Sequence, residues 1–237
     1  MQLRAEFAWV FGGELPEFTG NTGGSYTSGG GGWGPPAPIQ VAPGDVHGLI
    51  AAIVSANVSS GPDTISLHPG SIYALTEARA SSTGLPIVSS VININGYGAT
   101  IARDPGAGSF RIFYVGSGGE LTIDELTITR GAGPYTEGAG VHIDRGTLIL
   151  RDSTVSGNAN DGVFSNGGTL TASQSTVVEN GGHGLEGGSA VITVKNCIVA
   201  HNAHGNCGGT MVTWTVLGEN LSSDGTCTFT ITNTNPL

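Results

Sequence analysis

Three stretches of the chain repeat one pattern: Gly146-Thr-Leu-Ile-Leu-Arg-Asp-Ser-Thr-Val-Ser-Gly-Asn158, Gly168-Thr-Leu-Thr-Ala-Ser-Gln-Ser-Thr-Val-Val-Glu-Asn180 and Ala190-Val-Ile-Thr-Val-Lys-Asn-Cys-Ile-Val-Ala-His-Asn202. They align without gaps, and each copy begins 22 residues after the one before it. An earlier copy, Gly119–Gly131, precedes the first by 27 residues, which indicates five inserted residues around 133–137. Internal repeats of this length are typical of a solenoid, in which each repeat stacks on the next.

Each unit holds two short strands and then a third strand led by glycine, and three strands with three turns make one coil of a parallel β-helix. The shared position of Asn158, Asn180 and Asn202 predicts a structural ladder at a turn, because asparagine tolerates turn conformations and its amide can bridge coils. The same register predicts two inward columns, which are Leu148, Leu170 and Ile192, and Val155, Val177 and Val199.

The segments upstream of the repeat extend this organisation. Residues 63–70 and 91–101 resemble less regular coils, so we expect six or seven coils in all. Asp45 is a suitable N-cap for a helix near residues 45–56, and we expect that helix to cover the first coil. Residues 1–44 are rich in glycine and proline, and we interpret them as a tether or assembly segment that precedes a β-helix of residues 45–237. The apolar face predicted for the helix consists of Val46, Leu49, Ile50, Ile53 and Val54.

Composition and charge exclude several classes of protein. Glycine accounts for 41 of 237 residues, which argues against a mainly helical chain, because glycine weakens helices. The formal net charge of −10 and the lack of a basic patch argue against a nucleic-acid partner. No apolar run approaches the roughly 20 residues of a membrane helix, so we expect no membrane insertion.

Several segments resemble a known family. Ile92-Asn-Ile-Asn-Gly-Tyr-Gly-Ala-Thr-Ile-Ala-Arg103, Phe110-Arg-Ile-Phe-Tyr-Val115 and Asn220-Leu-Ser-Ser-Asp-Gly-Thr-Cys227 are similar to stretches of bacterial right-handed parallel β-helix repeat proteins. These are pectate-lyase-like surface proteins of the choice-of-anchor type. The resemblance covers about residues 41–237, and it implies an all-β, right-handed, single-stranded parallel β-helix in an exported protein, either extracellular or at the cell surface.

The resemblance also bears on the cysteines and the C-terminus. It suggests that Cys207 and Cys227 form a disulfide, which would close a 19-residue excursion from the coil pattern. Cys197 occupies the column of Ser153 and Ser175, so we expect a buried, inert thiol. In the family the sequence usually continues beyond a segment like 233–237, so we expect this chain to lack the family's anchoring region.

Two acid–histidine pairs are the candidate catalytic residues. Subtracting 22 places His183 over Asp161 and His201 over Glu179, and a neighbouring carboxylate tunes a histidine for acid–base work. A solvated turn, a binding or metal site and catalysis remain open for these pairs. Gly182-His183-Gly184 matches a polygalacturonase tripeptide, but the paired aspartates of that chemistry are missing and glycine is abundant. We therefore expect no cofactor or metal, although a lyase-like activity would require calcium.

Two function classes follow from these features. The first is a non-catalytic extracellular or cell-surface β-helix, a structural or binding module whose partners are surface glycans or further copies of itself. The second is an enzyme, a polysaccharide lyase or glycoside hydrolase that acts on acidic polysaccharide, which rests on analogy of fold. Ice binding through outward threonines such as Thr154 and Thr176 is a third, smaller alternative.

Overall fold

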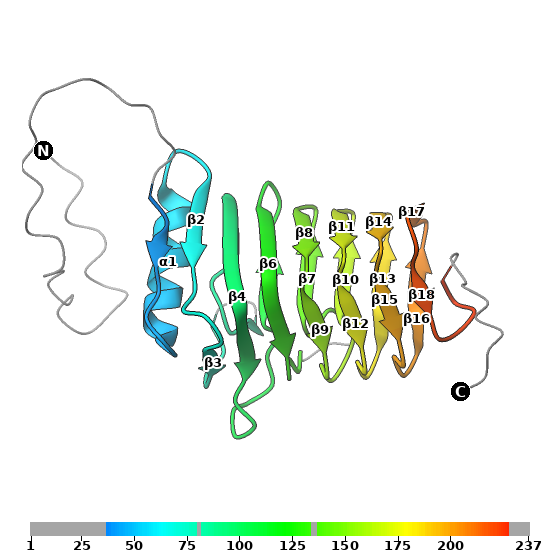
Figure 1. The fold of residues 1–237 in the computed structure, drawn as a ribbon, viewed down its shortest axis with the longest axis horizontal. Coiled ribbons are helices and arrows are strands. Elements are labelled where there is room, and N and C mark those ends of the chain that lie inside the picture. Colours follow the sequence, from blue (N-terminus) through cyan, green and yellow to red (C-terminus); the bar gives the residue numbers. More distant parts are fainter. Residues whose placement is uncertain (1–36, 80–81, 134–136, 228–237) are drawn as a thin grey trace, which may run out of the picture. The chain divides into compact units, whose positions relative to one another are not determined.

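The computed structural model describes residues 37–79, 82–133 and 137–227, and these residues form a parallel β-helix (Figure 1). A helix, α1, lies at the end of the stack where the described chain begins, and successive coils follow from it toward β16, β17 and β18. Most of the segment that the sequence assigns to a tether or assembly role, residues 1–36, lies outside the described residues. The segment 228–237 lies outside them as well.

The strands of the first half are irregular in length, whereas those of the second half repeat. The bounds of the first group are β1 Ile39–Gln40, α1 Val46–Val58, β2 Asp63–Ser66, β3 Ile72–Leu75, β4 Val91–Arg103, β5 Phe113–Val115 and β6 Glu120–Thr129. The bounds of the second group are β7 Val141–Asp144, β8 Thr147–Arg151, β9 Thr154–Ser156, β10 Val163–Asn166, β11 Thr169–Ser173, β12 Thr176–Val178, β13 His183–Gly188, β14 Val191–Lys195, β15 Ile198–Ala200, β16 Gly205–Thr210, β17 Thr213–Leu217 and β18 Leu221–Ser222.

The strands pair in parallel at the predicted step. Thr147 of β8 pairs with Thr169 of β11, which pairs with Val191 of β14, and Glu120 of β6 pairs with Thr147 across the longer first repeat. A separate five-stranded sheet has the order β16-β13-β10-β7-β5. The long strands β4 and β6 join the other two rows of strands into one curled sheet. Each regular coil therefore presents three strand faces, and the five-stranded sheet carries the candidate site.

Each corner of the regular coils contains one residue with positive φ, the left-handed region that lets the chain turn within a single residue. These residues recur at the repeat step, and glycine occupies only some of the positions. The three corner columns are Gly118, Arg145, Gly167, Ser189 and Met211; Glu125, Asp152, Gln174, Asn196 and Gly218; and Arg130, Gly157, Glu179 and His201.

The predicted inward columns and the asparagine ladder are confirmed. All six residues of the leucine and valine columns are fully buried. The side chain of Asn180 donates to Asn202 Oδ1 at 2.9 Å and accepts from the Asn158 amide at 2.9 Å. The same oxygens also accept backbone N–H groups of the preceding coil at 3.1 Å. The ladder thus satisfies buried polar groups in the interior of the turn.

The N-terminal helix forms as predicted, with two differences. Asp45 is the N-cap and accepts a hydrogen bond from Gly48 N–H at 2.8 Å, and α1 packs on β2, β3 and β4. Its buried residues are Leu49, Ala52, Ile53 and Ala56, whereas Val54, which the pattern placed on the same face, is 50% exposed. The predicted boundary at residue 44 is wrong, because β1 already pairs with β2 through Ile39 and Ile65.

The segment between Cys207 and Cys227 is a further coil, and the prediction of an excursion from the coil pattern is wrong. Thr213 of β17 pairs with Val191 at the same 22-residue step, and Leu221 of β18 pairs with Ile198. The repeat is hidden because Trp214 replaces the leucine or isoleucine of its column, and because Leu221 follows Ile198 by 23 residues instead of 22. The disulfide joins Cys207 to Cys227, as the resemblance suggested, and Cys197 is a buried free thiol.

Candidate functional site

The outer face of the five-stranded sheet carries a row of side chains at one register position. Tyr114 pairs with His142, His142 with Phe164, and Phe164 with Glu186, on four successive strands. The sequence contains the signal, since 142, 164 and 186 differ by 22, but sequence analysis missed this row. Strand pairing brings the side chains of neighbouring coils about 4.8 Å apart.

Three of these side chains form a stack. The rings of Tyr114 and His142 lie 4.9 Å apart and nearly parallel, and the ring of Phe164 lies 5.3 Å from His142 at a tilt. The guanidinium of Arg111 lies 5.6 Å from the centre of the Tyr114 ring. Burial, and then the positive charge of Arg111, lower the pKa of His142 to about 4, so the imidazole is neutral at physiological pH.

Polar side chains centred on Asp144 border the stack. Asp144 accepts hydrogen bonds from the Tyr114 hydroxyl at 3.2 Å and from Arg145 at 3.2 Å, and the Asn166 amide donates to it at 3.4 Å. The hydrogen bond from Arg145 holds the pKa of Asp144 below its usual range. The half-buried rings of Tyr114 and Phe164, beside planar hydrogen-bonding groups, form a surface suited to a ligand with both apolar and hydroxyl faces.

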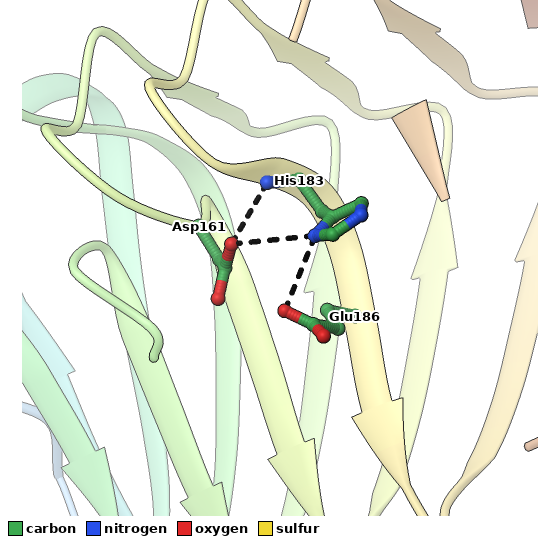
Figure 2. Close-up of side chains that lie close together, drawn as sticks. All are labelled: Asp161, His183 and Glu186. Carbon is green, nitrogen blue, oxygen red and sulfur yellow. Dashed lines mark hydrogen bonds and ion pairs between the residues drawn. The ribbon is translucent and has the colours of Figure 1, made fainter. Parts of the chain in front are cut away.

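Asp161, His183 and Glu186 form a second cluster at the other end of the row, and we call it the Asp161 site. Asp161 lies two residues before β10, His183 begins β13, and Glu186 lies three residues further along β13. His183 Nδ1 lies 3.3 Å from Glu186 Oε2 and 3.7 Å from Asp161 Oδ1 (Figure 2). The backbone N–H of His183 also donates to Asp161 Oδ1 at 2.8 Å.

The Asp161 side chain is almost fully buried, at 4% exposed, whereas the side chains of His183 and Glu186 are each 26% exposed. Burial raises the pKa of Asp161 to about 7, and hydrogen bonding and repulsion from Glu186 add to the effect. The backbone N–H groups of His183 and Gly138 oppose the rise by donating to the carboxylate. A carboxyl group with this pKa can exchange protons near neutral pH, so the cluster is suited to acid–base chemistry or to a bound cation.

The structure brings one predicted pair together and not the other. His183 contacts Asp161 as described. Glu179 and His201 are both exposed corner residues with φ of 57° and 56°, and no hydrogen bond or ion pair between their side chains occurs in the described chain. The His201 N–H donates instead to Ser223 Oγ at 2.9 Å. Both side chains are exposed at corners where the backbone is left-handed. The repeat alignment does not reveal this backbone conformation.

Glu186 was missed because regular alternation places residues 183 and 186 on opposite faces of a strand. In β13, Gly184 and Leu185 are both buried, so the alternation shifts by one residue. The His183 ring and the Glu186 carboxylate therefore face outward together. Asp161, His183 and Glu186 are also the one set of three potential metal ligands found within the described residues. The other aspartates that a calcium-dependent lyase could use, Asp124, Asp144 and Asp152, do not join it.

Comparison with known proteins does not assign this chain to a family. No family model and no curated protein matches the chain. One solved structure, described as the crystal structure of pectate lyase Pel9A, matches with 16% identity and a TM-score of 0.40 over 63% of this chain. The match covers 48% of that protein, so this chain spans about half of its length. The assignment of the fold therefore rests on the parallel strand pairing itself, which defines a β-helix protein.

The described residues contain no helix with the length and hydropathy needed to cross a bilayer. They do contain a disulfide between the coil of β16 and the segment after β18.

Proposed function

We propose that this protein is an extracellular or cell-surface β-helix module that binds glycans on the outer face of its five-stranded sheet. The observation that carries this proposal is the row of Tyr114, His142 and Phe164 at one register position, bordered by Asp144 and Arg145. Aromatic rings pack against the apolar faces of sugars, and neighbouring carboxylate and guanidinium groups bind their hydroxyls. The three rings come from three successive coils, so they form a short row that is suited to a linear chain.

The location outside the cell has separate support. A structural disulfide is typical of oxidising compartments, and the resemblance to bacterial choice-of-anchor surface proteins favours the same location. Self-association through the N-terminal segment stays a prediction, since that segment lies outside the described residues. Light scattering of the full chain and of a variant lacking residues 1–38 tests it.

The binding proposal is tested by a panel of neutral and acidic polysaccharides against the full chain, with affinity measured by calorimetry. We expect Phe164→Ala to weaken binding of the best ligand by about fivefold, since stacking contributes on the order of 1 kcal/mol. Thr171→Ala is the matched control, because Thr171 lies in the same coil on β11 and faces another side. Equal affinities for both variants, or a panel without any ligand, would contradict the proposal.

A second candidate function is cleavage of acidic polysaccharide, as a lyase or hydrolase. The observation that favours it is the buried Asp161 carboxyl, with its pKa near 7, beside the carboxyl of Glu186 and the His183 ring. Release of reducing ends or unsaturated products, with calcium present, distinguishes cleavage from binding alone. Activity abolished by Asp161→Asn, with unchanged circular dichroism, would establish this second function in place of a purely binding role.

A further inference from the structure

The ligand atoms of Asp161, His183 and Glu186 converge on one point of the outer face. One imidazole nitrogen and two carboxylate oxygens all lie within 4.8 Å of one another. The three side chains come from two neighbouring coils and point toward a shared space (Figure 2). Because His183 and Glu186 remain partly exposed, a solute has access to this space from the solvent.

The charges at this point are not balanced by the protein's cations. Neither carboxyl group forms an ion pair with lysine or arginine among the described residues, and the basic side chain beside both of them is the His183 ring. Two carboxylates side by side, one of them almost fully buried, are costly without a compensating positive charge. A cation coordinated by both oxygens would supply that charge.

The distances select the kind of cation. Zinc binds nitrogen and oxygen ligands at about 2.0–2.2 Å, so two ligands of a tetrahedral zinc site lie about 3.3–3.6 Å apart. The distance from His183 Nδ1 to Glu186 Oε2, 3.3 Å, falls in this range, and the distance to Asp161 Oδ1, 3.7 Å, lies about 0.1 Å beyond it. Calcium takes six to eight oxygen ligands at longer distances and has no preference for imidazole, so the donor set fits it poorly.

The surrounding backbone holds the ligands in place before a metal arrives. The His183 N–H fixes Asp161 Oδ1 at 2.8 Å, and Gly138 N–H donates to Oδ2 at 3.4 Å. A methyl group at Gly182 would collide with the Asp161 carboxylate, and one at Gly208 would lie 2.6 Å from the His183 ring. These two glycines therefore leave room for the ligand side chains, much as supporting groups around a metal orient its ligands.

We propose that Asp161, His183 and Glu186 bind a divalent zinc-type cation through Oδ1, Nδ1 and Oε2, with the fourth position open to solvent. The metal site shares no residue with the proposed glycan site. The two sites are neighbours, because Glu186 occupies the register position next to Phe164. Three protein ligands with an open fourth position are the arrangement that allows a metal to contact a further ligand.

The experiment titrates zinc chloride into the full chain after treatment with a chelator, at pH 7.5 and without any glycan, by calorimetry. We expect one zinc ion per chain from this site, no comparable heat with calcium or magnesium, and a higher melting temperature with zinc. Cobalt(II) in place of zinc should give the visible absorption of a four-coordinate site.

Asp161→Asn and Glu186→Gln should each weaken zinc binding by about tenfold or more and remove the cobalt spectrum. The matched control is Glu179→Asn, which removes a carboxylate at an exposed corner, where asparagine tolerates positive φ. Circular dichroism establishes that each variant folds. Zinc binding that persists unchanged in Asp161→Asn and Glu186→Gln, or the absence of zinc binding to the folded wild type, would overturn the proposal.

Discussion

His183 contacts Asp161 twice, because its backbone N–H donates to Oδ1 at 2.8 Å while its ring nitrogen Nδ1 lies 3.7 Å from the same oxygen. The contact joins two successive coils at a point where the repeat step of 22 residues places one residue above the other. It also buries a carboxyl group that has a titratable neighbour on each side, and the first prediction follows from that burial.

Asp161 should make the fold less stable as the pH rises. Its pKa is raised from 3.8 to about 7 in the folded chain, so the folded state holds a proton that the unfolded state releases. The stabilisation is therefore complete below about pH 4 and is lost as the pH rises toward 7, at up to about 1.4 kcal/mol per pH unit. Urea unfolding at several pH values, with a chelator present, should show this decrease disappearing in Asp161→Asn. An identical pH dependence in both proteins would contradict the assignment.

The contribution of His142 to stability should have the opposite pH dependence. Burial and the charge of Arg111 lower its pKa from 6.5 to about 4, although the nearby Asp144 opposes this, so stability falls as the pH drops from about 6.5 to 4. We expect His142→Phe to abolish that fall and to keep the stack between Tyr114 and Phe164. The variant should be at least as stable as the wild type at pH 5, because the buried Nδ1 of His142 has no hydrogen-bond partner. A loss of stability at pH 5 would argue against this account.

The asparagine ladder should be necessary for stability. Asn180 bonds to Asn158 and Asn202 on both sides and also donates to the Val155 carbonyl at 3.2 Å. Asn180→Ala should lower the free energy of unfolding by about 3 kcal/mol, because several buried polar groups lose their partners. Asn166→Ala, at an exposed position, should change it by less than about 0.5 kcal/mol. Thermal and urea unfolding measure both values, and equal losses would refute a special role for the ladder.

The cysteines should differ sharply in importance. Replacing both Cys207 and Cys227 with serine should cost about 3 kcal/mol, since the disulfide closes a loop with a sequence separation of 20. Cys197→Ser should cost less than about 1 kcal/mol, because Ser153 and Ser175 occupy the same column and donate to the carbonyl two residues earlier, as the Cys197 thiol does. Unfolding with and without a reducing agent measures the difference. A reduced protein as stable as the oxidised one would contradict the first expectation.

The backbone conformation of the corner residues gives a prediction about the stability of variants at His201, which sequence analysis paired with Glu179 as a candidate catalytic residue. His201 has φ of 56°, which a β-branched residue adopts at a cost of about 1–2 kcal/mol more than glycine. His201→Val should therefore be less stable than His201→Gly by about that amount, as measured by urea unfolding. If His201 instead formed a required contact with Glu179, both variants would lose stability equally.

Much of the fold could be predicted from the sequence, because each coil of a solenoid has the same packing requirements and the residue types therefore recur along the chain. Residues that repeat every 22 positions become neighbours when one coil stacks on the next. This is why the leucine column, the valine column and the asparagine ladder could be predicted from the sequence. The last coil escaped detection because Trp214 interrupts the leucine column and one extra residue before Leu221 breaks the 22-residue step. Register is a property of the backbone, so residue patterns reveal it only where side chains repeat.

The sequence by itself determined the β-helix, its capping helix and the stacking of His183 on Asp161, since all three depend on periodicity along the chain. Tertiary structure alone decided which groups share a face. Two successive buried residues, Gly184 and Leu185, turn Glu186 outward beside His183, whereas Glu179 and His201 lie at exposed left-handed corners. The physical reason is that side-chain direction depends on local backbone dihedrals, and a shift of one residue in the alternation reverses the face to which a side chain belongs.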